Sequence, residues 1–303
     1  MISSSAINPA NLRRGILLWC ASVLLWAAIE VLGGLAPIDY SAYQIVWMRY
    51  ATHLLFMLLI LGPRRRTRLV RTHHLKLQVA RGLLMLGMPV AFIVAAGLMP
   101  VNDAWAVFWI TPLLTMLLAA LVLRERIHPA LWIAALAGFA GTLIVEYPDR
   151  ALLTPALLLP LVMALCFSLY LVMTRLLRDD GTLTNLFYTA ACVLIPLSAG
   201  LPLFWRALTL PGLAIMAAIG LLGYVVLYLL DKAIEAAPVS VIAPFTYIQP
   251  IGVLVLIDLI THSAPAPLKI LGVLIIAGGI ACAIIWVVRP HAHSRTIATP
   301  TRG

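Results

Sequence analysis

The sequence has little charge and no long polar stretch. Of its 303 residues, 11% are charged and 63% are hydrophobic, and the mean hydropathy is +1.05. Soluble domains are roughly half apolar and about a quarter charged, so this composition indicates a membrane protein. The net charge of +10 would suit nucleic acid, but the basic residues fall in short segments between apolar runs, where they act as topology signals. We therefore expect membrane lipid, and no nucleic acid, around this chain.

The sequence also lacks the patterns that carry enzyme chemistry. No H-E-x-x-H, G-x-S-x-G or P-loop pattern occurs. Cys20, Cys166, Cys192 and Cys282 each lie inside an apolar run and show no paired spacing, so neither a disulfide nor a metal site is expected. We expect no enzyme activity and no cofactor. An intramembrane enzyme or a structural membrane subunit remains as an alternative class.

Ten apolar runs are long enough to cross a hydrocarbon core of roughly 30 Å as helices. They cover residues 15–33, 43–61, 80–98, 104–123, 130–146, 152–174, 184–204, 212–230, 239–260 and 268–288. The segment from Gly62 to Arg81 is expected to be a basic loop, and residues 1–14 and 289–303 to be polar tails. The sequence therefore predicts an all-α membrane protein with ten transmembrane helices.

A 64-residue block from Gly82 to Val145 recurs 138 residues later as Gly220 to Ala283. The strongest matches are the pairs Gly82/Gly220, Pro100/Pro238, Pro112/Pro250, Pro129/Pro267 and Gly141/Gly279. Chance matches are common among Leu and Ala in an apolar chain but rare among helix-breaking residues at one fixed offset. Repeated halves are typical of secondary transporters, which hold their substrate between the repeats.

The Lys and Arg residues predict the orientation. With the N-terminus in the cytoplasm, 17 of the 21 fall on the cytoplasmic side, whereas only Arg150, Arg206 and Lys269 fall outside and Arg49 lies within a span. Both termini are then cytoplasmic. Because five spans per repeat is an odd number, the second repeat must be inverted relative to the first.

Residues 106 to 145, AVFWITPLLTMLLAALVLRERIHPALWIAALAGFAGTLIV, combine a mid-helix proline, a Leu-x-Glu helix end and a small-residue fifth helix. This segment resembles the end of an EamA-type repeat, and the second copy keeps the proline and glycines but has Ser263 in place of Glu125. The chain is therefore similar to the drug/metabolite transporter superfamily. The resemblance implies two inverted five-helix repeats, at residues 15–147 and 152–288, in the bacterial inner membrane.

Ionisable residues inside a bilayer are functional candidates, because each costs about 2.5–3.5 kcal/mol on insertion scales. Arg49 lies about eight residues into the second span, with His53 one turn further on the same face. Glu30, in the outer third of the first span, could face Arg49. Two interpretations stay open: a structural ion pair between Arg49 and Glu30, or an Arg49 that binds a substrate carboxylate while Glu30 gates or carries a proton.

The fourth and ninth spans place aromatic and polar side chains where a site between repeats would lie. The candidates are Trp105, Trp109, Tyr247 and Gln249 for substrate binding, Asp103 and Asp258 for coupling or gating, and Pro112 and Pro250 as hinges. For Trp105 and Asp103 the alternatives are an interfacial anchor and a helix cap. Asp231, near the inner end of the eighth span, is interpreted as part of a solvated terminus.

The sequence thus predicts a secondary transporter that moves a small organic metabolite by alternating access. The first choice of substrate is an exported amino-acid-like or opine-like carboxylate-bearing compound, because a deep cation and nearby aromatics suit it. The alternative is import of a vitamin or nucleotide-like metabolite. A proton or counter-substrate would supply the driving force, since no ATP site is present, and a homodimer stays open.

Overall fold

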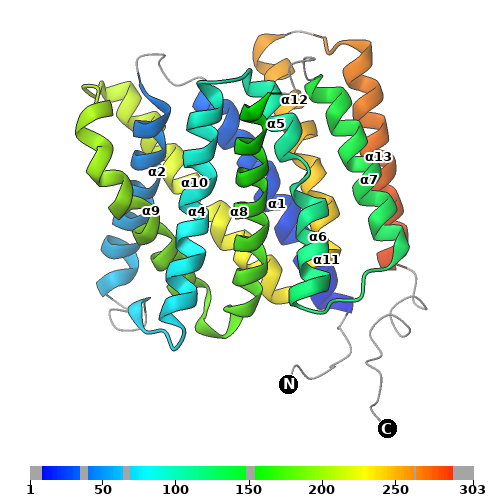
Figure 1. The fold of residues 1–303 in the computed structure, drawn as a ribbon, viewed down its shortest axis with the longest axis horizontal. Coiled ribbons are helices and arrows are strands. Elements are labelled where there is room, and N and C mark those ends of the chain that lie inside the picture. Colours follow the sequence, from blue (N-terminus) through cyan, green and yellow to red (C-terminus); the bar gives the residue numbers. More distant parts are fainter. Residues whose placement is uncertain (1–8, 35–39, 64–68, 148–153, 263, 289–303) are drawn as a thin grey trace.

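The computed structural model describes residues 9–34, 40–63, 69–147, 154–262 and 264–288, and in these ranges the protein is helical throughout its regular structure (Figure 1). Ten helical spans are long and apolar enough to cross a membrane. This confirms the predicted number of spans and the fold class. The predicted C-terminal tail lies outside the described residues, and the predicted N-terminal tail is helical from Pro9 onward.

The five spans of the first repeat are built from seven elements. They are α1 (Pro9–Gly34), α2 (Ala42–Phe56) with the π-helical η1 (Met57–Leu61), α4 (Leu75–Ala96), α5 (Val101–Phe108) with α6 (Thr111–Val122), and α7 (Pro129–Glu146). The fourth span is therefore a broken helix, interrupted at Trp109 and Ile110.

The second repeat has the same order. Its spans are the 3₁₀ turn η3 (Pro155–Leu157) with α8 (Leu158–Leu176), α9 (Thr182–Phe204), α10 (Leu210–Ala236), α11 (Val239–Ile242) with the 3₁₀ segment η5 (Ala243–Tyr247) and α12 (Ile248–Thr261), and α13 (Pro267–Val288). A short 3₁₀ turn, η4 (Arg178–Asp180), precedes α9. The ninth span, like the fourth, is broken.

The helix contacts show that the two repeats are related by a two-fold axis. In the first repeat α1 packs on α10 and α12, and in the second the equivalent helix α8 packs on α4 and α6. Likewise, α2 packs on α10 as α9 packs on α4, while α2 contacts its own equivalent α9 and α7 contacts α13. Each repeat therefore completes the core of the other.

The repeated glycines are the points of closest helix approach. A Cβ atom on Gly141 of α7 would lie 2.6 Å from the backbone oxygen of Gly272, and one on Gly279 of α13 would lie 2.7 Å from that of Ala134. Residues 134 and 272 are themselves 138 positions apart, so the two contacts are equivalent. Small residues at both positions let the α7 and α13 backbones approach closely, as is common between membrane helices.

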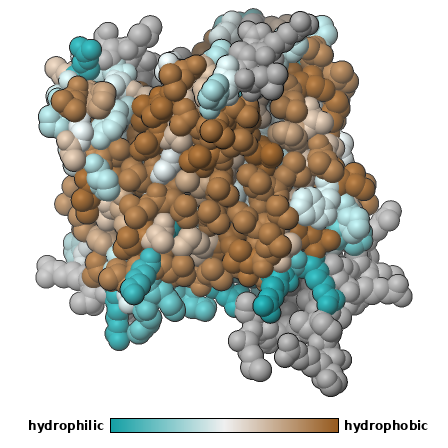
Figure 2. Space-filling view, viewed as in Figure 1, coloured by the Kyte–Doolittle hydropathy of each residue, from teal (hydrophilic) through white to brown (hydrophobic). Residues whose placement is uncertain are grey.

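The surface divides into bands, as expected for a protein that crosses a bilayer. Figure 2 shows hydrophobic residues over most of the face in view and hydrophilic residues along its lower edge. At this edge α1 begins and α13 ends (Figure 1), and we call it the terminal face and the opposite end the distal face. Six exposed basic residues lie on helices or connections at the terminal face, Arg13, Arg14, Arg71, Lys76, Arg124 and Arg126, whereas the exposed Arg206 and Lys269 lie toward the distal face (Figure 1).

Two helices extend further toward the terminal face than their apolar runs suggest. The helix α4 begins at Leu75 and α10 continues to Ala236. The expectation that Arg81 belongs to a loop and Asp231 to a solvated terminus is wrong, because both side chains are buried inside the bundle, at 0% and 1% exposure. Their opposite charges lie together, which lets polar residues stay within the helical core.

Candidate functional site

A closed cavity lies between the two repeats. It is lined by Trp19, Val23, Trp26, Phe108, Trp109 and Thr111 of the first repeat and by Phe167, Leu230, Thr246 and Gln249 of the second. Its free space is about 10 Å³, roughly the room for one water molecule. A metabolite does not fit in this space, so the lining residues must move before one can enter.

The breaks in the fourth and ninth spans place the cavity residues. Trp109 stands at the break between α5 and α6, and Thr246 lies in the 3₁₀ segment η5 that precedes α12. Pro112 and Pro250 lie in the first turns of α6 and α12 respectively, where a missing backbone N–H leaves no hydrogen bond unmade. The prolines therefore follow the breaks directly, and their role as hinges stays a prediction.

Hydrogen bonds between the repeats hold the cavity wall. The Trp19 indole donates to Thr246 Oγ1 at 3.2 Å, and the Tyr247 hydroxyl donates to the Trp109 carbonyl oxygen at 3.0 Å. The Tyr247 ring also fills the space above Gly138, where a Cβ atom would lie 2.2 Å from it. Tyr247 is fully buried, and its hydrogen bond to Trp109 fixes the α5/α6 break against η5. It therefore stabilises the cavity wall but does not line the cavity.

Two carboxylates hold cavity residues from the distal side. Gln249 donates to Glu30 Oε2 at 3.0 Å, and the Trp109 indole donates to Glu146 Oε1 at 3.2 Å. The ion pair between Glu30 and Arg49, one of the two interpretations of the sequence, does not form, because the Glu30 side chain is directed to Gln249 of α12. The structure thus connects Gln249 and Trp109, two predicted binding residues, with Glu30, a predicted gating residue.

Arg49 lies against aromatic rings. Its guanidinium carbon is 5.9 Å from the Trp26 ring centroid and 5.6 Å from that of Tyr50. Its Nε is buried without a hydrogen-bond partner, and none of the ion pairs among the described residues includes it. Arg49 does not line the closed cavity but contacts Trp26, which does. It is a half-buried cation that has no anionic partner among the described residues.

Two other predicted binding residues, His53 and Trp105, do not line the cavity. His53 is buried between the rings of Tyr50 and Tyr224, at centroid distances of 6.3 Å and 5.1 Å. Trp105 is half-buried and packs on Trp109 at 6.3 Å, in a second aromatic layer.

Neither predicted aspartate lines the cavity. Asp103 is buried in the first turn of α5, where a negative charge interacts favourably with the helix N-terminus. It is not the cap, because Pro100 occupies that position. Asp258 is half-buried in the distal part of α12.

Several cavity residues were not found from the sequence. Trp19, Trp26 and Phe167 lie within apolar runs that predict spans, and no pattern in the sequence marks them as lining a cavity. Glu146 stands at the end of a span, where a carboxylate is expected to be solvated, so only the tertiary fold reveals its bond to Trp109.

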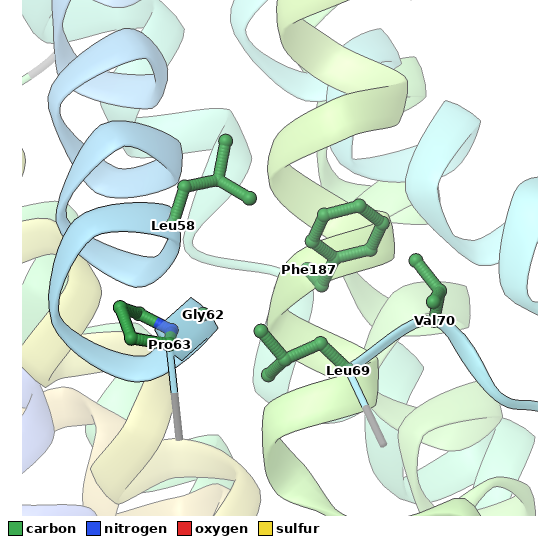
Figure 3. Close-up of a pocket in the computed structure, with 6 residues that line it drawn as sticks. All are labelled: Leu58, Gly62, Pro63, Leu69, Val70 and Phe187. Atoms are coloured by element: carbon green, nitrogen blue, oxygen red, sulfur yellow. The ribbon is translucent and has the colours of Figure 1, made fainter. Parts of the chain in front are cut away.

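A larger pocket lies elsewhere and has a different lining. It has a volume of about 350 Å³ and lies between η1, the segment before α4, and α9, as Figure 3 shows. Its lining residues are Leu58, Gly62, Pro63, Leu69, Val70 and Phe187. None of these six lining side chains carries a polar group that could orient a ligand, unlike the lining of the cavity between the repeats.

The inverted repeats, the paired broken helices and the cavity between them define a multi-pass membrane protein of the repeated-carrier type. The sequence pattern of the EamA-like transporter family matches residues 13–147 and again residues 154–285. The chain belongs to this family, within the drug/metabolite transporter superfamily.

Curated relatives include transporters of two different metabolites. The chain is 27% identical over 184 residues to an S-adenosylmethionine uptake transporter of Rickettsia bellii, with 59% of this chain and 62% of the relative covered. It is 30% identical over 188 residues to a riboflavin transporter of Rhizobium johnstonii, with 61% of this chain and 62% of the relative covered. The chain thus spans less than two thirds of the length of these relatives.

A solved crystal structure has the same fold. It superposes with a TM-score of 0.78 at 21% identity and covers 91% of this chain and 98% of its own. At this identity the likeness concerns the fold alone.

Proposed function

We propose that this protein is a secondary transporter that carries a small organic metabolite with a flat aromatic ring through the cavity between its repeats. The observation that carries the proposal is the cavity wall, in which five of the ten lining residues are Trp or Phe and three are Thr or Gln. Aromatic walls bury and stack a flat ring, while the few polar groups orient it.

The relatives support the same substrate class. S-adenosylmethionine and riboflavin, named for the two relatives, differ in size and charge but share a flat heteroaromatic ring system. The first relative is an uptake transporter, which favours import, the alternative direction, over export.

A second candidate rests on Arg49. A half-buried cation with no anionic partner among the described residues suits a carboxylate, so export of an amino-acid-like or opine-like compound is the second function. A substrate with both a ring and a carboxylate would use both features, with the carboxylate reaching Arg49 as Trp26 moves.

Transport into liposomes tests the proposal. Purified full-length protein in liposomes should take up riboflavin or radiolabelled S-adenosylmethionine in a saturable way, several-fold faster than protein-free liposomes. Sucrose, which has no aromatic ring, should enter both at the same rate. Saturable uptake of sucrose, or no saturable flux of any ring-bearing probe from either side, would contradict the proposed substrate class.

We further propose that the terminal face is cytoplasmic and that the protein lies in a bacterial inner membrane. The exposed basic residues on that face support this orientation. A reporter protein that is active only in the cytoplasm should then be active when it is fused after Gly303. A reporter active only outside would reverse the topology.

A further inference from the structure

A buried charge pair lies beside the cavity, toward the terminal face. Arg81 of α4 and Asp231 of α10 are 0% and 1% exposed, and Arg81 Nη1 is 3.9 Å from Asp231 Oδ1. Arg81 belongs to the first repeat, whereas all its polar partners belong to the second. The pair therefore crosses the interface that must rearrange during transport.

Arg81 gives its hydrogen bonds to other groups. Nη1 donates to Thr174 Oγ1 at 2.8 Å, and Nη2 donates to the Asn185 carbonyl oxygen at 2.5 Å and to Thr189 Oγ1 at 2.7 Å. The guanidinium also lies 4.7 Å from the Tyr170 ring centroid. α8 and α9 thus hold the cation in place without help from Asp231.

Asp231 has the opposite environment. Within the described part of the chain, no donor reaches either carboxylate oxygen in hydrogen-bonding geometry. The Asn185 amide lies beside the carboxylate but donates to the Leu177 carbonyl oxygen at 3.5 Å. The charge of Asp231 is therefore supported mainly by attraction to Arg81 and more weakly by the nearby Asn185 amide, and a proton on either oxygen would displace no hydrogen bond of normal geometry.

The groups that face Asp231 come from three helices besides α10. Arg81 comes from α4, Tyr170 from α8 and the neutral Asn185 from α9, while Lys232 and Glu235 of α10 act from the same helix. Tyr50 of α2 interacts with Tyr170 and not with Asp231 itself. The described parts of α1, α11 and η4 also pack on α10, but they add no charge that acts on Asp231. Arg81 is thus the main compensating charge from outside α10.

The pair is adjacent to the cavity wall. Leu230, the residue before Asp231, lines the cavity. Phe167, which also lines it, stacks on Tyr170 at a centroid distance of 6.1 Å, and Tyr170 in turn lies against Arg81. The pair is therefore connected to two residues of the wall, to Leu230 through the chain and to Phe167 through Tyr170.

We propose that Asp231 is a proton-binding site that couples the proposed transport to a proton gradient. An aqueous proton forms an O–H bond with the carboxylate, which becomes neutral, and the attraction that ties α10 to Arg81 is lost. α10 is then free to move from α4 and to open the cavity on the terminal face, while Arg81 stays bound to α8 and α9. Release of the proton restores the tie.

Infrared spectroscopy tests the proton site without any substrate. Full-length protein in liposomes is compared between mildly alkaline and mildly acidic buffer, and the wild type should gain the C=O band of a protonated carboxyl. Asp231→Asn should lose one carboxyl component of this difference. Glu235→Gln is the matched control, because Glu235 accepts hydrogen bonds from Thr182 and Lys232 and should not contribute the same component.

Two further variants protect the test against misfolding. In Arg81→Gln the carboxyl should stay protonated in both buffers, so the same component should vanish from the difference spectrum. In Asp231→Glu it should persist at a shifted frequency. Spectra of folded Asp231→Asn or Asp231→Glu that match the wild type would overturn the proposal.

A transport measurement separates this inference from the proposed function on which it rests. If riboflavin or S-adenosylmethionine is carried, a proton gradient should speed wild-type flux several-fold and leave Asp231→Asn unchanged, while exchange without a gradient continues in both. Equal acceleration of both proteins would overturn the coupling. Failure of every ring-bearing probe would overturn the proposed substrate class but not the infrared result.

Discussion

Trp109→Ala is expected to lower uptake of a ring-bearing substrate about tenfold or more at low concentration. Stacking of an aromatic side chain on a flat base contributes roughly 1–3 kcal/mol, and about 1.4 kcal/mol corresponds to tenfold in affinity. Trp109 lines the cavity from the break between α5 and α6, so its removal also enlarges the site. Initial uptake rates over a range of substrate concentrations measure the effect.

Controls distinguish this loss from damage to the fold. Trp205→Ala makes the same change at a side chain 43% exposed that lies outside the cavity, and it should leave uptake within about twofold, as surface changes generally do. Trp109→Phe keeps a ring but removes the hydrogen bond to Glu146, so an intermediate rate is expected. Wild-type uptake by Trp109→Ala would remove this residue from the site.

Arg49→Ala is expected to abolish transport of a carboxylate-bearing substrate without lowering the thermal stability of the protein. A cation at the centre of a membrane helix costs about 2.5–3.5 kcal/mol on insertion scales, which is an upper limit for the half-buried Arg49, and contacts with Trp26 and Tyr50 return about 0.5–2 kcal/mol each. Because Arg49 takes part in no ion pair among the described residues, its removal leaves no buried acid unpaired. Uptake and the thermal midpoint are measured on the same preparation.

A second substitution tests the geometry of the cation. Arg49→Lys keeps the charge but not the planar guanidinium that pairs with a carboxylate through two parallel hydrogen bonds, so partial transport is expected. A clear fall in thermal midpoint for Arg49→Ala, with transport per folded molecule unchanged, would show a structural role only. A ring-bearing substrate without a carboxylate should be less affected than one that carries it.

The duplication followed from the sequence because it depends on residues with strong local effects. Gly141 and Gly279 match at a fixed offset, and in the structure they make equivalent close approaches. Pro112 and Pro250 match in the same way and mark the two broken spans, although each lies just after the break. Small residues and helix breakers act through the backbone, so their structural effects can be predicted from their positions in the sequence.

The polar partners did not follow from the sequence. Glu30 was a candidate partner of Arg49, yet it accepts a hydrogen bond from Gln249. Glu30 lies in the distal part of α1, and Gln249 comes from a helix 219 positions later in the chain. The residue that a side chain meets on a neighbouring helix depends on the rotation of both helices about their axes and on their crossing angle. The sequence of one chain of apolar helices does not specify these angles.

The sequence by itself determined that this chain crosses a membrane ten times as two inverted repeats, because hydropathy, basic residues and duplicated helix breakers are local and additive signals. The tertiary structure alone decided that Trp19, Trp26 and Phe167 share one cavity and that Arg81 meets Asp231. A charged residue near a helix end reads from sequence as solvated. Only packing shows that neighbouring helices have taken it out of water.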